Sequence, residues 1–285
     1  MHAFVTVFLF AALLCGNARA ASVSDRYFTT SDHARLHYWE AGKGTHTLVF
    51  VPGWLMPAAV FEKQVRELSK DFRVIAFDPR AHGKSEVHRG PYTPRRRSKD
   101  LDELLQHAGV ESCILAGWSL GVMEVLDYLA KHHPPQVRGL ILIDNSIGEG
   151  TPPRSSGSSR PSSSSREERM RGFTASLTKK PLSKSLFETI HRSTLQIPEP
   201  VASELIHKPF PREYWRDTLL AQKVPVLYAI RPRFREQGDA LLSKKPALAS
   251  VEIFPQAGHA LFLDEPERFN QITTQFARRV FAAAP

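Results

Sequence analysis

The chain has 285 residues, 42% of them apolar and 24% charged, and its formal net charge is +9. This length and apolar content favour one large α/β domain with an insertion over two small domains. The basic clusters at residues 95–97 and 179–180 lack the aromatic or helical context of a nucleic-acid site. The charge therefore indicates a solvated basic face and argues against a nucleic-acid partner.

The first 20 residues have the features of a cleavable signal peptide. Residues 3–15 are apolar except for Thr6, and this run is too short to cross a bilayer, which needs about 20 residues. Small residues at Ala18 and Ala20 fit a signal-peptidase site. We expect a secreted or periplasmic protein with no stable membrane anchor. Cys113 is then the only cysteine of the mature chain, so no intramolecular disulfide forms.

The pattern that follows is typical of an α/β fold. Apolar runs rich in β-branched residues alternate with amphipathic stretches of helical period, which predicts a mostly parallel central sheet with helices on both faces. In chain order the predicted elements are an early hairpin at 34–40, a strand at 47–51, a helix at 59–68, a strand at 73–77, a helix at 98–107, a strand at 112–116, a helix at 122–131 and a strand at 139–143.

The alternation stops after the sixth strand. Residues 151–166 contain eight serines, three prolines and a glycine, a composition that predicts a flexible linker. Residues 167–220 have helical periodicity without strand signals, and we interpret them as a helical lid over the carboxyl edge of the sheet. The sheet pattern resumes at 224–230 and 250–254, and a helix at 266–281 closes the fold. The predicted core thus comprises residues 21–150 and 221–285.

The sharpest chemical signal is the pentapeptide Gly117-Trp118-Ser119-Leu120-Gly121 between a strand and a helix, which we call the elbow. A serine on such a tight turn projects its hydroxyl outward, and the glycines are needed because a Cβ there would collide with neighbouring backbone. The pattern predicts Ser119 as a nucleophile, with an ordinary glycine-containing turn and a capping serine as the alternative.

A second glycine turn follows the strand that ends at Val51. Here the backbone N–H of Trp54 would join that of Leu120 in an oxyanion hole, beside the positive end of the following helix. The alternative is a plain strand-ending Pro-Gly turn.

A histidine in a glycine turn after the last strand is the candidate general base. His259 follows the serine in chain order and precedes the final helix. A neutral imidazole there can accept the Ser119 proton and later donate it to the leaving group.

These motifs resemble the α/β-hydrolase superfamily, in its branch of small serine esterases and cofactor-free haloperoxidase-like enzymes. Residues 77–85 are similar to the family's Asp-x-Arg-Gly-x-Gly-x-Ser turn, which is structural, and residues 264–269 match the usual start of its last helix. The resemblance implies a serine hydrolase that cleaves a small-molecule carboxylic ester through an acyl-enzyme, with no metal or organic cofactor. Perhydrolysis, acyl transfer and C–C or lactone cleavage on the same site stay open, as does a non-catalytic binding protein.

The triad acid departs from the family pattern. Relatives usually carry it three or four residues after the strand represented here by residues 225–230, and this chain has Arg231-Pro232-Arg233-Phe234 there, with no carboxylate. We rank three substitutes. Asp144, at the end of the preceding strand, comes first, Glu149 in the same loop second and Asp239 third; an absent acid would slow catalysis by orders of magnitude without abolishing it.

Overall fold

The computed structural model describes residues 22–150, 164–207 and 210–283. The predicted signal peptide lies outside the described residues, as does the predicted linker up to residue 163, so both stay predictions. Among the helices of the described ranges, none combines the length and the apolar character that a membrane span requires.

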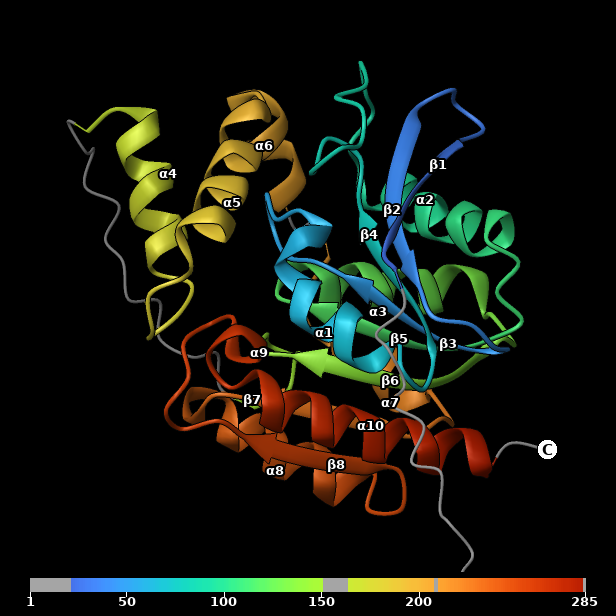
Figure 1. Ribbon diagram of the computed structural model, residues 1–285. Helices are drawn as coiled ribbons and strands as arrows, with labels where there is room; N and C mark the ends of the chain where they lie inside the picture. Colours follow the sequence, from blue (N-terminus) through green and yellow to red (C-terminus); the bar gives the residue numbers. More distant parts are fainter. Residues whose placement is uncertain (1–21, 151–163, 208–209, 284–285) are drawn as a thin grey trace, which may run out of the picture.

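An eight-stranded sheet forms the centre of the molecule (Figure 1). Its strand order is β1-β2-β4-β3-β5-β6-β7-β8; the β1–β2 and β2–β4 pairs are antiparallel, and every other pair is parallel. This confirms the predicted mostly parallel sheet. The strands are β1 Ser24–Thr29, β2 Arg35–Ala41, β3 His46–Val51, β4 Arg73–Asp78, β5 Ser112–Trp118, β6 Val137–Ile143, β7 Val226–Ile230 and β8 Ala249–Ile253.

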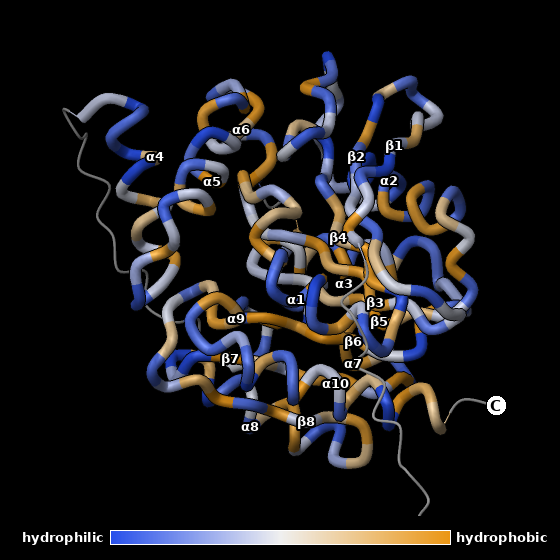
Figure 2. The backbone as a smooth tube through the Cα atoms, viewed as in Figure 1, coloured by the Kyte–Doolittle hydropathy of each residue, from blue (hydrophilic) through white to orange (hydrophobic). Residues whose placement is uncertain are grey.

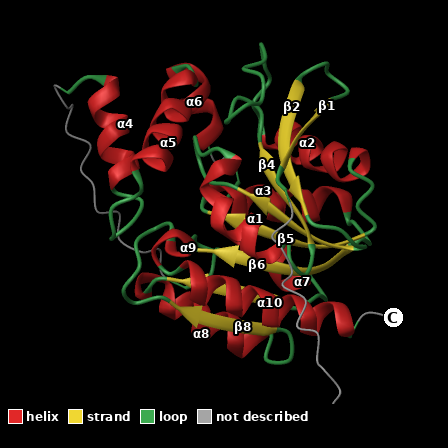
Figure 3. Cartoon of the chain, viewed as in Figure 1, coloured by secondary structure: helices red, strands yellow, loops and turns green. Residues whose placement is uncertain are grey.

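Two apolar clusters cover the two faces of this sheet. Successive side chains of β5 alternate between them, with Ile114 and Ala116 in one and Cys113 and Leu115 in the other. The central strands read as continuous apolar runs because both faces are buried, and apolar residues gather along them in Figure 2. Figure 3 shows the helices packed on both sides. Against the first face lie α1 Glu62–Leu68, α9 Leu261–Asp264 and α10 Pro266–Ala282; against the second lie α2 Pro94–His107, α3 Leu120–His132 and α8 Arg235–Lys244.

One helix begins earlier than its periodicity predicts. α2 begins at Pro94 rather than at residue 98, because the Thr93 side chain caps it by accepting the Arg96 N–H and because proline suits the first helical position.

The described part of the segment between β6 and β7 contains four helices joined by loops, and no strand. α7 (Arg212–Ala221) packs beside α3, where the Tyr214 hydroxyl donates to Asp127 at 2.6 Å. The other three helices, α4 Arg166–Ala175, α5 Lys184–Gln196 and α6 Glu199–Ile206, gather at one end of the molecule (Figure 3).

α5 and α6 contact the loops that follow β3 and β4. Gln196 donates to the Gly83 carbonyl at 2.5 Å, and the Trp54 indole donates to the Ala202 carbonyl at 2.8 Å. They therefore lie against the carboxyl edge of the sheet, where the lid is predicted; its action as a lid stays a prediction.

Candidate active site

Ser119 occupies the turn between β5 and α3 in a backbone conformation that side chains rarely adopt, with φ at +53°. The flanking glycines explain how the turn is reached. A Cβ at Gly117 would lie 2.5 Å from the Gly121 carbonyl oxygen, and one at Gly121 would lie 2.2 Å from that of Val51. The predicted need for glycine is confirmed, and the strained turn places the serine hydroxyl at the strand end.

His259 meets Ser119 across 140 positions of sequence. Its Nε2 lies 2.9 Å from Ser119 Oγ, within proton-transfer reach. Two contacts hold the histidine loop: Trp118 Nε1 donates to the His259 carbonyl at 2.9 Å, and the Gly258 N–H donates to Asp264 at 2.7 Å. The His259 side chain is 26% exposed, so solvent reaches the pair.

Asp144 is the carboxylate on the other side of the imidazole. His259 Nδ1 lies 2.7 Å from Asp144 Oδ2, and the aspartate side chain is completely buried. The other two candidates lie elsewhere: Glu149 accepts two hydrogen bonds from Lys244 Nζ, and Asp239 is exposed on α8. The structure therefore brings Ser119, His259 and Asp144 into one chain of contacts and leaves Glu149 and Asp239 outside it.

Arg231 is a fourth member of this cluster, and it is the first residue after β7. Its Nε and Nη2 each lie 2.7 Å from Asp144 Oδ2, and its backbone N–H donates to Oδ1 at 2.9 Å. The sequence prediction named this arginine only as part of the segment that lacks a carboxylate. The signal for its role was a basic residue directly after the strand that precedes the missing acid.

The oxyanion hole is predicted at the place where the β3 turn meets Ser119. A Cβ at Gly53 would come within 2.9 Å of Ser119 Cβ, so this turn lies directly against Ser119. Leu120 is the first residue of α3, and its N–H therefore has no acceptor inside the helix. The N–H groups of Trp54 and Leu120 thus belong to two segments that meet at Ser119, as the prediction requires.

A buried histidine supports the Trp54 turn. His82 Nε2 accepts the N–H of Leu55, a residue held at φ +62°, while His82 Nδ1–H donates to the Arg80 carbonyl at 2.9 Å. Burial lowers the pKa of His82 to about 4, so the ring is neutral and its tautomer is fixed by these two bonds. Sequence reasoning treated residues 77–85 as a structural turn and missed this link to the site.

Comparison with known proteins agrees with the architecture. Residues 46–266 match the family profile described as the alpha/beta hydrolase fold. This chain belongs to the α/β-hydrolase family. The resemblance stated from the elbow and the histidine turn is confirmed.

Within this family the chain is similar to the AB hydrolase superfamily protein YisY of Bacillus subtilis, with 32% identity over 118 residues, 41% of this chain and 44% of that protein. It is also similar to the pimeloyl-(acyl-carrier protein) methyl ester esterase of Vibrio atlanticus, with 32% identity over 112 residues, 38% of this chain and 40% of that protein. The chain spans less than half the length of these relatives. An esterase from Exiguobacterium antarcticum shares the fold, with a TM-score of 0.72, 22% identity and coverage of 90% of this chain and 100% of that one.

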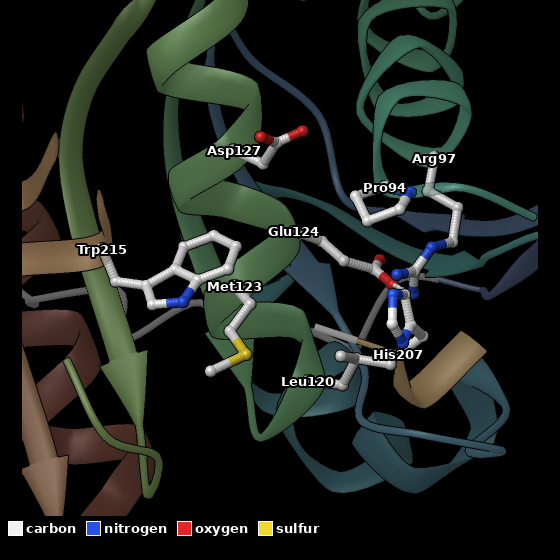
Figure 4. Close-up of a pocket in the computed structure, with 8 residues that line it drawn as sticks. All are labelled: Pro94, Arg97, Leu120, Met123, Glu124, Asp127, His207 and Trp215. Atoms are coloured by element: carbon white, nitrogen blue, oxygen red, sulfur yellow. Dashed lines mark hydrogen bonds and ion pairs between the residues drawn. The ribbon is translucent and has the colours of Figure 1, made fainter. Parts of the chain in front are cut away.

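A hollow adjoins the Ser119 turn on one face of α3 (Figure 4). Leu120, the first residue of α3, forms the wall nearest to Ser119. The helix that follows the turn therefore also lines the hollow. Further along, Glu124 pairs with Arg97; burial raises the pKa of Glu124 although the guanidinium opposes that shift. The lining is mixed apolar and charged: Pro94, Arg97, Leu120, Met123, Glu124, Asp127, His207 and Trp215.

Proposed function

We propose that this chain is a serine hydrolase that cleaves a small-molecule carboxylic ester through an acyl-enzyme on Ser119. The observation that carries the proposal is the continuous contact chain from Ser119 Oγ through both nitrogens of His259 to Asp144, with distances of 2.9 and 2.7 Å. This is the arrangement that removes a proton from a hydroxyl while holding the imidazole in one tautomer.

In the first half of the reaction Ser119 Oγ attacks the ester carbonyl carbon, and His259 Nε2 takes its proton. The carbonyl oxygen becomes an oxyanion, to which the N–H groups of Trp54 and Leu120 donate. Asp144 accepts the Nδ1–H of His259 and stabilises the imidazolium. The C–O bond then breaks, and His259 returns the proton to the departing alkoxide, which leaves as the alcohol.

In the second half water takes the place of the alcohol. His259 removes a proton from water, the hydroxide oxygen attacks the acyl carbon, and the ester bond to Ser119 Oγ breaks. The serine recovers its proton from the imidazolium, and the carboxylic acid departs. The partial exposure of His259 gives water access to this step.

The comparisons support the same reaction class without fixing the substrate. One relative is named for cleavage of a methyl ester, and a protein of the same fold is named an esterase. The Ser119 nucleophile also favours an acyl-enzyme over the alkyl-enzyme chemistry that an aspartate in the elbow would support.

Labelling with a fluorophosphonate tests the proposal. The wild-type protein should label at Ser119, located by peptide mass spectrometry, and Ser119→Ala should lose labelling and at least about 10⁵-fold of kcat on p-nitrophenyl esters. Ser146→Ala is the matched control, because that hydroxyl lies two residues beyond Asp144 and bonds to Gln237 instead. It should label like the wild type.

Two results would reject the proposal: folded wild-type protein that does not label, or a Ser119→Ala variant that labels at another residue with unchanged turnover. A series of p-nitrophenyl esters of increasing acyl length then separates a simple esterase from two alternatives. One is an enzyme that transfers the acyl group to peroxide or to an alcohol, and the other is an enzyme that cleaves a C–C bond or a lactone. A simple esterase hydrolyses members of the series without added peroxide or alcohol.

A further inference from the structure

The loop segment in which the family pattern places the acid begins here with a cation that binds Asp144. Arg231 directly follows β7, and Asp144 directly follows the neighbouring β6. The two strands are paired in parallel, so their ends meet at one edge of the sheet. From there the arginine reaches Asp144 with its backbone N–H and with two guanidinium nitrogens.

We propose that Arg231 is a positioning residue that holds the Asp144 carboxylate aligned for His259. The inference rests on the proposed hydrolase function and extends it to a fourth residue. It assigns the arginine an action through the carboxylate rather than on the substrate.

The burial of Asp144 explains why the aspartate needs a cation. Its side chain is completely inaccessible, and burying a carboxylate is costly unless an opposite charge and hydrogen bonds replace the lost solvation. His259 contributes one hydrogen-bond contact to this carboxylate. Arg231 contributes hydrogen bonds and a positive charge, since its guanidinium is always charged.

The geometry also fixes the direction of the carboxylate. Oδ1 accepts the Arg231 backbone N–H, whereas Oδ2 accepts the Arg231 Nε–H, pairs with Nη2 as an ion pair and contacts His259 Nδ1. Rotation of the carboxyl group would break these bonds together. The oxygen that faces the imidazole is therefore held in place before the reaction begins.

The same guanidinium acts against the imidazolium that forms later. Arg231 Nη2 lies 3.4 Å from His259 Nδ1, close enough for two positive charges to repel. Asp144 Oδ2 lies 2.7 Å from each of these two nitrogens, nearer to both than they are to one another, so its negative charge offsets their repulsion. We infer that alignment of the acid outweighs the repulsion, so that removal of the arginine slows the reaction.

A double-mutant cycle on kcat distinguishes action through Asp144 from a direct effect on His259. Arg231→Met should lower kcat by about 10- to 100-fold with KM changed less than about threefold, and Arg231→Lys, which keeps the charge, should lose less. In an Asp144→Asn background the same Arg231→Met change should lower kcat by less than about threefold. Arg235→Met, at an exposed arginine of the next helix, is the matched control and should leave kcat unchanged.

Proton NMR of the His259 Nδ1–H detects the contact with Asp144 in the absence of substrate. Its low-field resonance should be present in the wild type and in Arg231→Lys and absent or shifted upfield in Arg231→Met. Wild-type kcat for Arg231→Met, or an equal loss of kcat with and without the Asp144 carboxylate, would overturn the inference. Fluorophosphonate labelling of the wild type keeps the outcomes separate: failure to label rejects the hydrolase, while a labelled enzyme that is indifferent to Arg231 rejects only the positioning role.

Discussion

Two histidine–aspartate pairs in this molecule have the same short contact and different surroundings. His259 Nδ1 lies 2.7 Å from Asp144 Oδ2, and His37 Nδ1 lies 2.7 Å from Asp78 Oδ2. The partner of the second nitrogen separates them. Nε2 of His259 faces the Ser119 hydroxyl, whereas Nε2 of His37 faces a second carboxylate, Asp25, at 2.8 Å.

The difference shows what a histidine–carboxylate contact contributes by itself. His37 satisfies both carboxylates only when both of its nitrogens donate, so neither nitrogen is left to accept a proton. Its side chain is 1% exposed, against 26% for His259. The His37 pair thus joins β2 to the end of β4, while the His259 pair leaves Nε2 facing the Ser119 hydroxyl and solvent. A short histidine–aspartate contact does not by itself indicate a triad. The partner of the second ring nitrogen makes the difference.

Parallel removal of the two carboxylates is the strongest test of this contrast. Asp144→Asn should lower kcat by about 10³- to 10⁴-fold, because an amide neither stabilises the imidazolium nor enforces the tautomer. Asp78→Asn should lower the free energy of unfolding by about 3 kcal/mol, because Asp78 accepts from His37, from the Ala58 N–H and from the Lys84 N–H in a buried site. Steady-state kinetics and urea unfolding measure the two effects.

Both substitutions disturb a buried carboxylate, so both can lower stability. The two variants are therefore distinguished by their kcat values. The folded Asp78→Asn enzyme should retain kcat within about threefold of the wild type. Equal losses of kcat in the two variants would mean that the pairs are functionally alike and would remove the distinction between them.

A third histidine, His82, sharpens the comparison because it is neutral and both of its ring nitrogens contact backbone groups. The pKa of His82 is lowered by burial to about 4, so the unfolded chain binds this proton first, near pH 6.5, and the folded chain only near pH 4. Its contribution to stability is therefore complete above about pH 6.5 and is lost as the pH falls toward 4, by about 3 kcal/mol in total. Urea unfolding at a series of pH values measures it.

His82→Gln provides the reference for that pH series. Glutamine retains an acceptor for the Leu55 N–H and does not titrate, so the difference in unfolding free energy between wild type and variant should change with pH between 4 and 6.5. Groups common to both proteins cancel, including Glu124, whose pKa burial raises, and Asp32, whose pKa is lowered to about 2. Parallel stability curves for the two proteins would show that His82 does not carry this slope.

The fold was predictable because local patterns determine it. Apolar runs, helical periodicity and the glycines of the elbow are short-range signals, and the strands from β3 to β8 lie within a few residues of the predicted ranges. Ser119 and His259 were candidates for the same reason, since each sits in a recognisable turn. Their contact follows from the parallel sheet, whose strand ends meet at one edge.

The acid was harder to select because no local sequence pattern determines the direction in which a loop carboxylate points. Asp144 and Glu149 lie in one loop, and the sequence does not state which carboxylate turns toward His259. The structure separates them through the positive φ of 45° at Asp144 and the cations that each one binds. Arg231 and His82 were missed for a related reason: each acts on a residue far away in sequence, through contacts that appear only when strand ends meet.

Glu149 allows the smallest and most specific test of that separation. Both of its carboxylate oxygens accept from Lys244 Nζ, at 2.7 and 2.8 Å, and the lysine side chain is 46% exposed. Because this pair is partly solvated and remote from the imidazole contacts, Glu149→Gln should leave kcat within about twofold and lower the unfolding free energy by about 1 kcal/mol or less. Asp239→Asn, at an exposed position of α8, is the matched control and should change neither quantity measurably. A loss of kcat by about 100-fold or more in Glu149→Gln would instead make Glu149 the carboxylate that acts on His259, and the contact of Asp144 would then be structural like that of Asp78.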